Sequence, residues 1–96
     1  MTQKGSNISE ALRRAKEEEE DVFLASLSKE ELESTGFDTS TFGEFEFVNI
    51  YLMWDGNEFV LKYIFDADPS QFYYEKESEI GDLLDVVEEY ISIGGE

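Results

Sequence analysis

Carboxylates are the side chains of this sequence that offer the most chemistry. The chain has 96 residues, of which 24 are Asp or Glu and 7 are Lys or Arg, and it has no His and no Cys. The absence of His removes the commonest general base and metal ligand, and the absence of Cys removes disulfides, thiolate metal sites and cysteine nucleophiles. What remains is carboxylate chemistry, which can bind a cation, transfer a proton or hold a basic partner.

Two kinds of carboxylate site can be compared with what the sequence provides. Asp66 and Asp68 could ligate a hard cation, but Pro69 and Ser70 follow them, and although position 12 from Asp66 is Glu77, the glycine that a calcium loop needs at position 6 is missing. Paired acids can hydrolyse glycosides, a reaction that needs a sugar cleft. No Gly-rich phosphate loop and no nucleophile elbow is present. We therefore expect a turn at 66–70, and a protein that is not an enzyme and uses no cofactor or metal.

The charge is divided unevenly along the chain. Residues 1–16 hold four basic side chains and one acid, a net charge of +3, whereas residues 17–96 hold three lysines and 23 acids, a net charge of −20. Solubility of a small domain needs a net charge of only about 2–8 in magnitude. Because a phosphate backbone binds a basic face, the sequence disfavours direct contact with nucleic acid and indicates a basic protein partner.

The spacing of the acids suggests how such a partner would be bound. Duplex DNA carries about one negative charge per 1.7 Å of its axis, and carboxylates at i and i+2 of a strand lie about 6.6 Å apart. Glu44 and Glu46 have this spacing. Glu75, Glu77 and Glu79 repeat it at the approach to the last helix. A regular row of this kind can present negative charge to a groove that is built for phosphate.

Helical spacing gives the remaining candidates. Asp85 and Glu89 are an i, i+4 pair, about 6 Å apart on a helix, and Asp82 lies three residues before Asp85. The acidic run at 17–21 is a second choice, because the basic residues at 13–16 partly cancel it. The predicted partner-binding carboxylates are Glu44, Glu46, Glu58, Glu75, Glu77, Asp82, Asp85 and Glu89.

The first elements that must position these side chains are helical. Residues 1–7 are polar and lack periodicity, so they are interpreted as a flexible tail before a single domain at 8–96. Ser9, or alternatively Ser6, is the predicted N-cap of a helix through residues 10–27.

Capping signals predict two more helices. Ser28 and Glu31 fit a capping box for a short helix that Gly36 ends. Ser78 is the predicted cap of an amphipathic helix over 79–92 that packs on the sheet. Its apolar stripe is Ile80, Leu83, Leu84, Val87, Tyr90 and Ile91.

A β-hairpin is predicted in the middle of the chain. Residues 44–54 and 57–66 are rich in β-branched and aromatic side chains, and the Asp-Gly dipeptide at 55–56 favours a tight turn between them. This turn would pair Trp54 with Asn57. The predicted core face is then Val48, Ile50, Leu52, Trp54, Phe59, Leu61, Tyr63 and Phe65.

The fold class that follows is α+β. N-terminal helices precede an antiparallel hairpin, to which residues 71–77 could add a third strand, and the amphipathic C-terminal helix comes last. The second face of the hairpin is more apolar than a solvated face should be, so a helix or another chain must cover it. If the first helix does not, a twofold homodimer is expected. The apolar residues of this face are Phe47, Tyr51, Met53, Val60 and Ile64.

In length, charge, aromatic content and lack of catalytic residues the chain resembles, as a class, the small acidic DNA-mimic proteins made by bacteriophages. The resemblance rests on composition, with 15% aromatic residues and a net charge of −17, and on no motif, so no site residue is taken from it. It implies a protein that binds the DNA-binding surface of a basic host protein in the host cytoplasm and blocks DNA. Targets of the class include nucleoid proteins of the HU type, RNA polymerase, restriction enzymes and CRISPR effectors.

Two other classes of function remain open. An immunity protein or antitoxin that plugs a basic toxin nuclease would use the same electrostatics. A halophile housekeeping protein would be acidic for solvation alone, although such proteins tend to have few bulky apolar residues and this chain has 8 Phe and 5 Tyr. Neither a membrane span of ~18 apolar residues nor the apolar stretch of a signal peptide is visible in the sequence, so it predicts a cytoplasmic protein without membrane contact.

Crowding of charge predicts how stability responds to salt. Self-repulsion among the acids should be screened as ionic strength rises, so the melting temperature should increase between low salt and ~0.5 M NaCl. Crowding should also raise carboxyl pKa values in the folded state, so that mild acidification stabilises the protein too. Thermal melts followed by circular dichroism test both expectations, and a melting temperature that falls with added salt would contradict the first.

Overall fold

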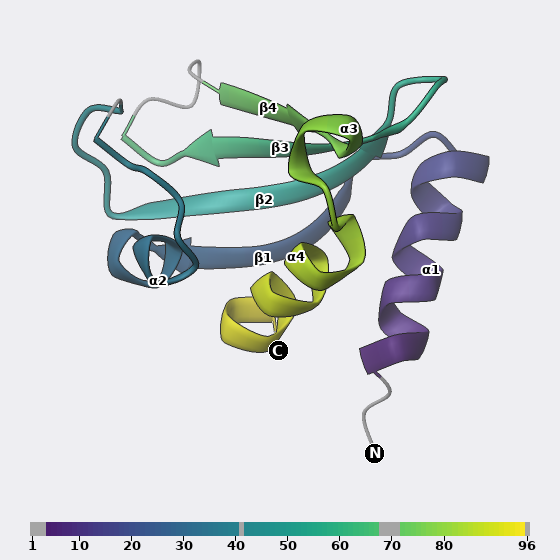
Figure 1. Cartoon of the computed structure of the whole chain (residues 1–96), viewed down its shortest axis with the longest axis horizontal. Coiled ribbons are helices and arrows are strands. Elements are labelled where there is room, and N and C mark those ends of the chain that lie inside the picture. Colours follow the sequence, from purple (N-terminus) through teal and green to yellow (C-terminus); the bar gives the residue numbers. More distant parts are fainter. Residues whose placement is uncertain (1–3, 41, 68–71, 96) are drawn as a thin grey trace.

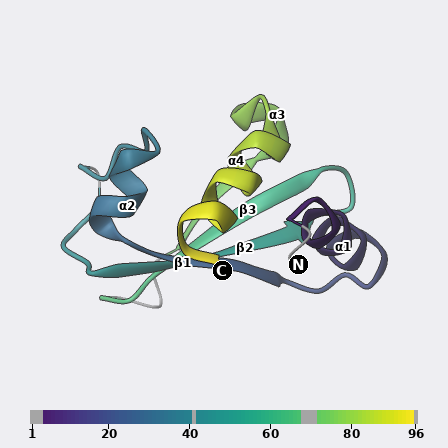
Figure 2. The same ribbon diagram turned by 90° about the horizontal axis from the view of Figure 1, so that it is seen from below.

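The protein is an α+β fold in which helices cover one face of a four-stranded antiparallel sheet (Figures 1 and 2). The structure, a computed structural model, describes residues 4–40, 42–67 and 72–95. The strand order is β1-β2-β3-β4, so each strand pairs with its neighbour in the sequence. The predicted fold class is confirmed, and the sheet has more strands than expected. The elements are α1 Lys4–Glu17, β1 Val22–Ser28, α2 Lys29–Ser34, β2 Phe47–Trp54, β3 Phe59–Phe65, β4 Phe72–Lys76, α3 Glu77–Ile80, α4 Leu83–Tyr90 and a π-helical turn η1, Ile91–Gly95.

The extra strand, β1, comes from a segment that was predicted to be helical. The helix α1 begins at Lys4, before the predicted cap at Ser9, and ends at Glu17. The acids that follow are unfavourable at a helix C-terminus, where the helix dipole is negative, and Glu19 adopts a positive φ of 54°. The chain then turns back and enters the sheet.

A β-bulge explains why β1 was difficult to recognise. The pairing with β2 shifts between Phe23 and Ala25, so Leu24 and Ala25 both point into the core. Two consecutive buried residues break the period-two alternation of a strand and imitate the spacing of a helix. The prediction of one helix over residues 10–27 is therefore wrong from Glu18 onwards, and Val22–Ser28 is a strand.

The short helix α2 follows its predicted capping box. The backbone N–H of Glu31 donates to Ser28 Oγ at 3.1 Å, and the N–H of Ser28 donates to Glu31 Oε1 at 2.9 Å. Gly36 ends the element with a φ of 95°. Both capping signals are confirmed.

The hairpin of β2 and β3 exists, but its register differs from the prediction. Trp54 pairs with Phe59 instead of Asn57. The loop between the two strands runs over 55–58, and Asp55 is its first residue and not one of the two central residues of the turn. Its Oδ1 accepts the backbone N–H of Asn57 at 2.7 Å and that of Glu58 at 2.8 Å, while Gly56 takes a φ of 97°. Since every partner moves by two residues, the alternation is preserved and the predicted core face still points inward.

The single C-terminal helix predicted over 79–92 is two helices. Gly81, with a φ of 94°, separates α3 from α4, and Asp82 caps α4 by accepting the N–H of Asp85 at 3.4 Å. Ser78 is therefore inside α3 and is not the cap. The stripe of α4 packs on the sheet as predicted at Leu83, Val87 and Tyr90, whereas Leu84 is 52% exposed.

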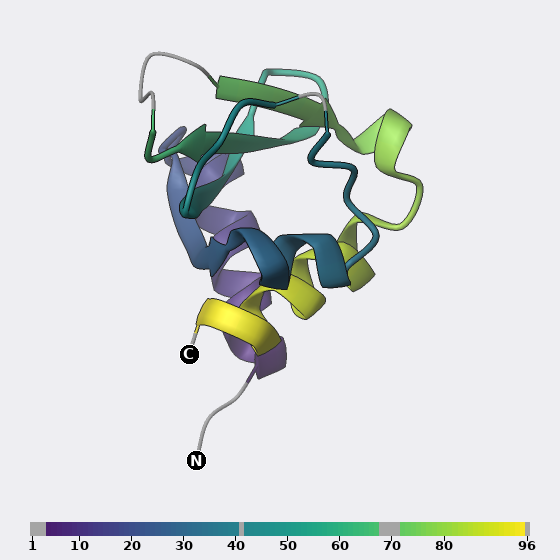
Figure 3. The ribbon, with the colours of Figure 1, turned by 90° about the vertical axis from the view of Figure 1, so that its left-hand side faces the viewer.

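The core lies between the inner face of the sheet and the elements that cover it. Val48, Ile50, Leu52, Leu61 and Tyr63 are fully buried. The covering layer consists of α1, α2, α4 and the connection between α2 and β2 (Figure 3). The rings of Phe37 and Phe42 in this connection pack on Tyr63 and Phe65. Trp54 and Phe59, also predicted for this core, are only partly buried at the end of the hairpin. None of the helices that the structure describes is long and apolar enough to cross a membrane.

The other face of the sheet, called the open face below, is covered by none of the helices that the structure describes (Figure 2). The first helix does not cover it, because Ile8, Ala11 and Ala15 of α1 belong to the core on the opposite side. The open face consists of alternate strand residues: Phe23, Ser26 and Ser28 of β1, Phe47, Asn49, Tyr51 and Met53 of β2, Val60, Lys62 and Ile64 of β3, and Phe72, Tyr74 and Lys76 of β4.

Core packing gives a first prediction for mutagenesis. Leu61 on β3 has no exposed surface, so Leu61→Ala should lower the free energy of unfolding by about 2–5 kcal/mol, as expected for a buried leucine. Leu84→Ala is the matched control and should change it by less than about 0.5 kcal/mol. Urea denaturation of both variants measures the difference, and equal losses would show that Leu61 is not a core residue.

Candidate functional site

The carboxylates predicted to bind a partner are distributed over three regions. Glu44 and Glu46 lie in the connection before β2, which begins at Phe47, so the strand spacing assigned to them is wrong. The N–H of Glu46 donates to Asp66 Oδ1 at 3.0 Å, and this contact ties the connection to the end of β3. These two acids lie at the opposite end of β2 from the hairpin turn, roughly 24 Å away along the strand.

The second region is the hairpin turn, where Glu58 and Glu77 have structural contacts. Glu58 Oε1 accepts the N–H of Ser78 at 2.9 Å, and Glu77 Oε1 accepts the N–H of Phe59 at 3.4 Å. The pair fastens α3 to the hairpin. Because Glu77 starts a helix, the alternation expected from Glu75 to Glu79 is interrupted at that residue.

The third region brings together acids from β4, α3 and α4. Glu75, Glu79 and Glu89 line a hollow of about 190 Å³, whose apolar walls include Phe37 and Tyr90. Further carboxylates continue this surface along α4, where Asp85 lies close enough to Asp82 and Glu88 for their charges to affect its pKa. We call this group the acidic helical surface; it consists of Glu75, Glu79, Asp82, Asp85, Glu88 and Glu89.

Carboxylates of the acidic helical surface affect one another. A side-chain hydrogen bond with Asp82 is the main cause that raises the pKa of Asp85, and repulsion by the charges of Asp82 and Glu88 adds to it. The crowding predicted from the sequence therefore exists on α4. A cation brought by a partner would relieve this repulsion.

A buried hydrogen-bond network supports the floor of the hollow. The Tyr63 hydroxyl donates to Glu75 Oε1 at 2.9 Å and lies 2.7 Å from the Tyr90 hydroxyl. Burial is the main cause that raises the pKa of both tyrosines, so both keep their protons at neutral pH. The network fixes the carboxylate of Glu75 and leaves the hollow with negative charge and hydrogen-bond acceptors.

The ion pairs of the described residues involve acids near the N-terminus. Arg13 contacts Glu10 at 2.7 Å and Glu18 at 3.2 Å, and Arg14 contacts Glu20. Within the described ranges, every ion pair takes its acid from residues 10–21. The acids from Glu30 onwards that the structure describes have no such partner, which agrees with placing the run at 17–21 second.

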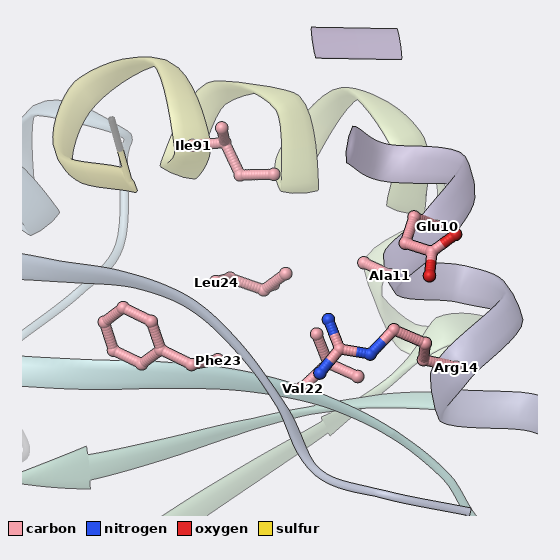
Figure 4. A pocket seen from close by; sticks show the side chains of 7 residues that line it. All are labelled: Glu10, Ala11, Arg14, Val22, Phe23, Leu24 and Ile91. Carbon is pink, nitrogen blue, oxygen red and sulfur yellow. The ribbon is translucent and has the colours of Figure 1, made fainter. Parts of the chain in front are cut away.

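A second hollow, of about 240 Å³, lies between α1, β1 and η1 (Figure 4). Arg14 reaches from α1 across to β1, beside Val22 and Leu24. Its guanidinium is already engaged by Glu20. This hollow has an apolar floor and a satisfied ion pair, and it belongs to the more basic end of the chain.

Asp66, a candidate cation ligand in the sequence, has a structural contact instead. Asp66 Oδ1 accepts the N–H groups of Glu46 and Phe47, so this residue helps to form a turn. Asp68, Pro69 and Ser70 lie outside the described residues. Among the residues that can be described, no group of three or more acids is arranged to hold a metal ion.

No family model, curated protein or solved structure matches the chain.

The acidic helical surface includes two acids that the predicted set omitted. Glu88 lies three residues after Asp85, a helical spacing that was visible in the sequence. Glu79 was noted for its alternation, but its place beside Glu89 depends on how α3 and α4 fold against β4. Sequence spacing could therefore have identified Glu88 but not Glu79.

Hydrogen bonding to carboxylates predicts how stability depends on pH. The N–H of Glu58 is the main cause that lowers the pKa of Asp55, and the N–H of Phe47 is the main cause for Asp66. Because these groups bind protons more readily in the unfolded chain, stability is lost as pH falls through about 4. For these residues the expected stabilisation by acid is therefore wrong, whereas the raised pKa of Asp85 acts in the predicted direction.

We expect the urea midpoint of the wild-type protein to fall between about pH 5 and about pH 2.5, because the lowered pKa values place the loss below the unfolded carboxyl pKa of about 4. Asp66→Asn keeps an acceptor oxygen without a titrating group, so its fall should be smaller. Asp85→Asn removes the group with the raised pKa, so its fall should be larger. A wild-type midpoint that rises on acidification would show that crowding outweighs the hydrogen bonds.

Proposed function

We propose that this protein binds the DNA-contacting surface of a basic, nucleic-acid-binding protein and thereby excludes DNA from it. The observation that carries the proposal is the separation of ion pairs from the acidic helical surface. All described ion pairs use acids at 10–21, while six carboxylates on β4, α3 and α4 have no cationic side chain paired with them.

The arrangement of these carboxylates suits a surface that binds phosphates. Asp85 and Glu89 lie one helical turn apart, at a spacing of about 6 Å, and Glu88 lies beside them. Lysine and arginine side chains that neutralise successive phosphates of DNA could contact such a row instead. The accumulated negative charge also steers a basic partner and makes association fast and sensitive to salt.

The hollow beside this row supports recognition of a long cationic side chain. Its rim carries Glu75, Glu79 and Glu89, and its walls include the rings of Phe37 and Tyr90. Lys and Arg combine an apolar stem with a charged tip, so the stem can pack on the rings while the tip meets the carboxylates. This geometry favours a protein partner over free cations, which need no apolar wall.

The first test identifies the partner and then measures whether this protein displaces DNA from it. The tagged protein is used to capture proteins from a bacterial lysate at low salt, and proteins released at high salt are identified by mass spectrometry. We expect basic DNA- or RNA-binding proteins. Each is then given a labelled duplex, and fluorescence anisotropy is recorded as this protein is added. The labelled duplex should be released, and the concentration of this protein needed to release it should rise steeply with salt.

Charge-reversal variants locate the contact. Asp85→Lys, Glu88→Lys and Glu89→Lys together should weaken competition by about tenfold or more, with little loss of stability because the three side chains are exposed. The matched control reverses three acids at the end of α1, namely Glu17, Glu18 and Glu19. This control makes the same change in net charge and should weaken competition less.

Two outcomes would contradict the proposal. If a captured partner keeps its duplex while this protein is bound, the protein is an adaptor that binds outside the DNA site. If the α4 variant and the α1 control weaken binding equally, overall charge and not the acidic helical surface determines the affinity. A captured toxin nuclease would instead support the immunity-protein alternative.

A further inference from the structure

The open face of the sheet has a different chemistry from the rest of the molecule. Among the described strand positions that point outward on this face, none holds an acid and two hold lysines, Lys62 and Lys76, although the chain has 24 acids. Large aromatic side chains occupy it instead. A solvated sheet face in such an acidic chain would be expected to carry part of the charge.

We propose that the open face is the interface of a homodimer in which two copies pack sheet on sheet. This inference is independent of the proposed function, because it concerns the opposite side of the molecule from the acidic helical surface.

The exposed area is sufficient for such an interface. Phe23, Phe47, Phe72 and Tyr74 are 53%, 50%, 48% and 45% exposed. A fully buried aromatic side chain removes about 150–250 Å² from water, so the exposed parts of these four rings amount to roughly 300–500 Å² per copy. With their partly exposed neighbours, two copies reach the roughly 1,000 Å² at which specific interfaces begin.

The rings already form the start of a packed layer. Phe23 contacts Tyr51 edge to face at 5.6 Å, and Phe72 contacts Tyr74 in the same way at 5.5 Å. Lys62 lies between Tyr51 and Tyr74 in the strand register, and Val60, the next residue of β3 on the same face, is only 4% exposed. A second sheet would complete this layer at the usual spacing of about 10 Å between packed sheets.

Lys62, the charged side chain in the middle of the open face, already has its partners within one copy. Lys62 Nζ lies 3.5 Å from Asp21 Oδ2 and 5.3 Å from the centre of the Phe72 ring. Covering Lys62 therefore leaves it with a carboxylate and an aromatic face as partners. Asp21 precedes β1, so this ion pair is at the border of the interface.

The distribution of charge selects a second copy as the occupant. Stacking the open faces places the two helical layers on the outer sides, so their acids are separated by two sheets and by more than the Debye length of about 8 Å. A basic partner would meet Lys62 and Lys76 here and would be directed by charge to the acidic helical surface instead. A second copy brings a matching acid-free aromatic face.

Sedimentation velocity from micromolar to hundreds of micromolar protein tests the dimer. The wild-type protein should have twice the chain mass of 11.1 kDa. Phe47→Lys should dissociate it into monomers. Leu84→Lys is the matched control, because Leu84 is 52% exposed, close to the 50% of Phe47, but lies on α4, and this variant should remain dimeric. Circular dichroism verifies folding, and Tyr74→Lys replaces Phe47→Lys if that variant does not fold.

The response to salt separates this proposal from the proposed function. Screening should preserve or strengthen the dimer in ~0.5 M NaCl, whereas it should weaken binding of a basic partner. A wild-type protein that remains monomeric at all these concentrations and salt conditions would overturn the inference. A dimer that persists in the folded Phe47→Lys and Tyr74→Lys variants would also overturn it, and would place the contact elsewhere, such as the edge of β4.

Discussion

Seven basic side chains cannot balance 24 acidic ones, so most carboxylates of this protein have to be accommodated without an ion pair. At several points of the fold, backbone N–H groups donate hydrogen bonds to a carboxylate in place of a cationic partner. Asp55 holds the hairpin turn and Asp66 holds the start of β2, each by accepting two N–H groups. Hydrogen bonds to a carboxylate are about twice as strong as those between neutral groups. These acids therefore determine where strands and turns begin, and the acids left over are available for a partner.

The same scarcity of cations organises the surface. The basic residues of α1 serve the acids nearest to them in sequence, through Arg13 and Arg14. The far side of the molecule thus keeps its negative charge, and the open face of the sheet is kept free of acids at its described strand positions. One small domain presents three regions of different electrostatic character.

Local signals in the sequence predicted local structure well. The capping box of Ser28 and Glu31 and the hairpin were both recognisable, and the two faces of the hairpin were assigned correctly although Trp54 was given the wrong partner. What escaped prediction depends on contacts between distant residues. The bulge at Leu24 is stabilised by pairing with β2, and the break at Gly81 lets α3 remain on the hairpin while α4 packs on the core. Spacing along the chain likewise identified Asp85 with Glu89, but only folding brings Glu75 next to Glu89 and gives Glu58 a structural contact.

The position of β4 at the edge of the sheet has a consequence for solubility. An edge strand offers a row of backbone donors and acceptors to any other strand, and its aromatic run at 72–74 would favour such pairing. Glu75, Glu77 and Glu79 follow directly, and like charges on two approaching edges oppose their alignment. These carboxylates therefore act as gatekeepers that oppose edge-to-edge pairing of two sheets.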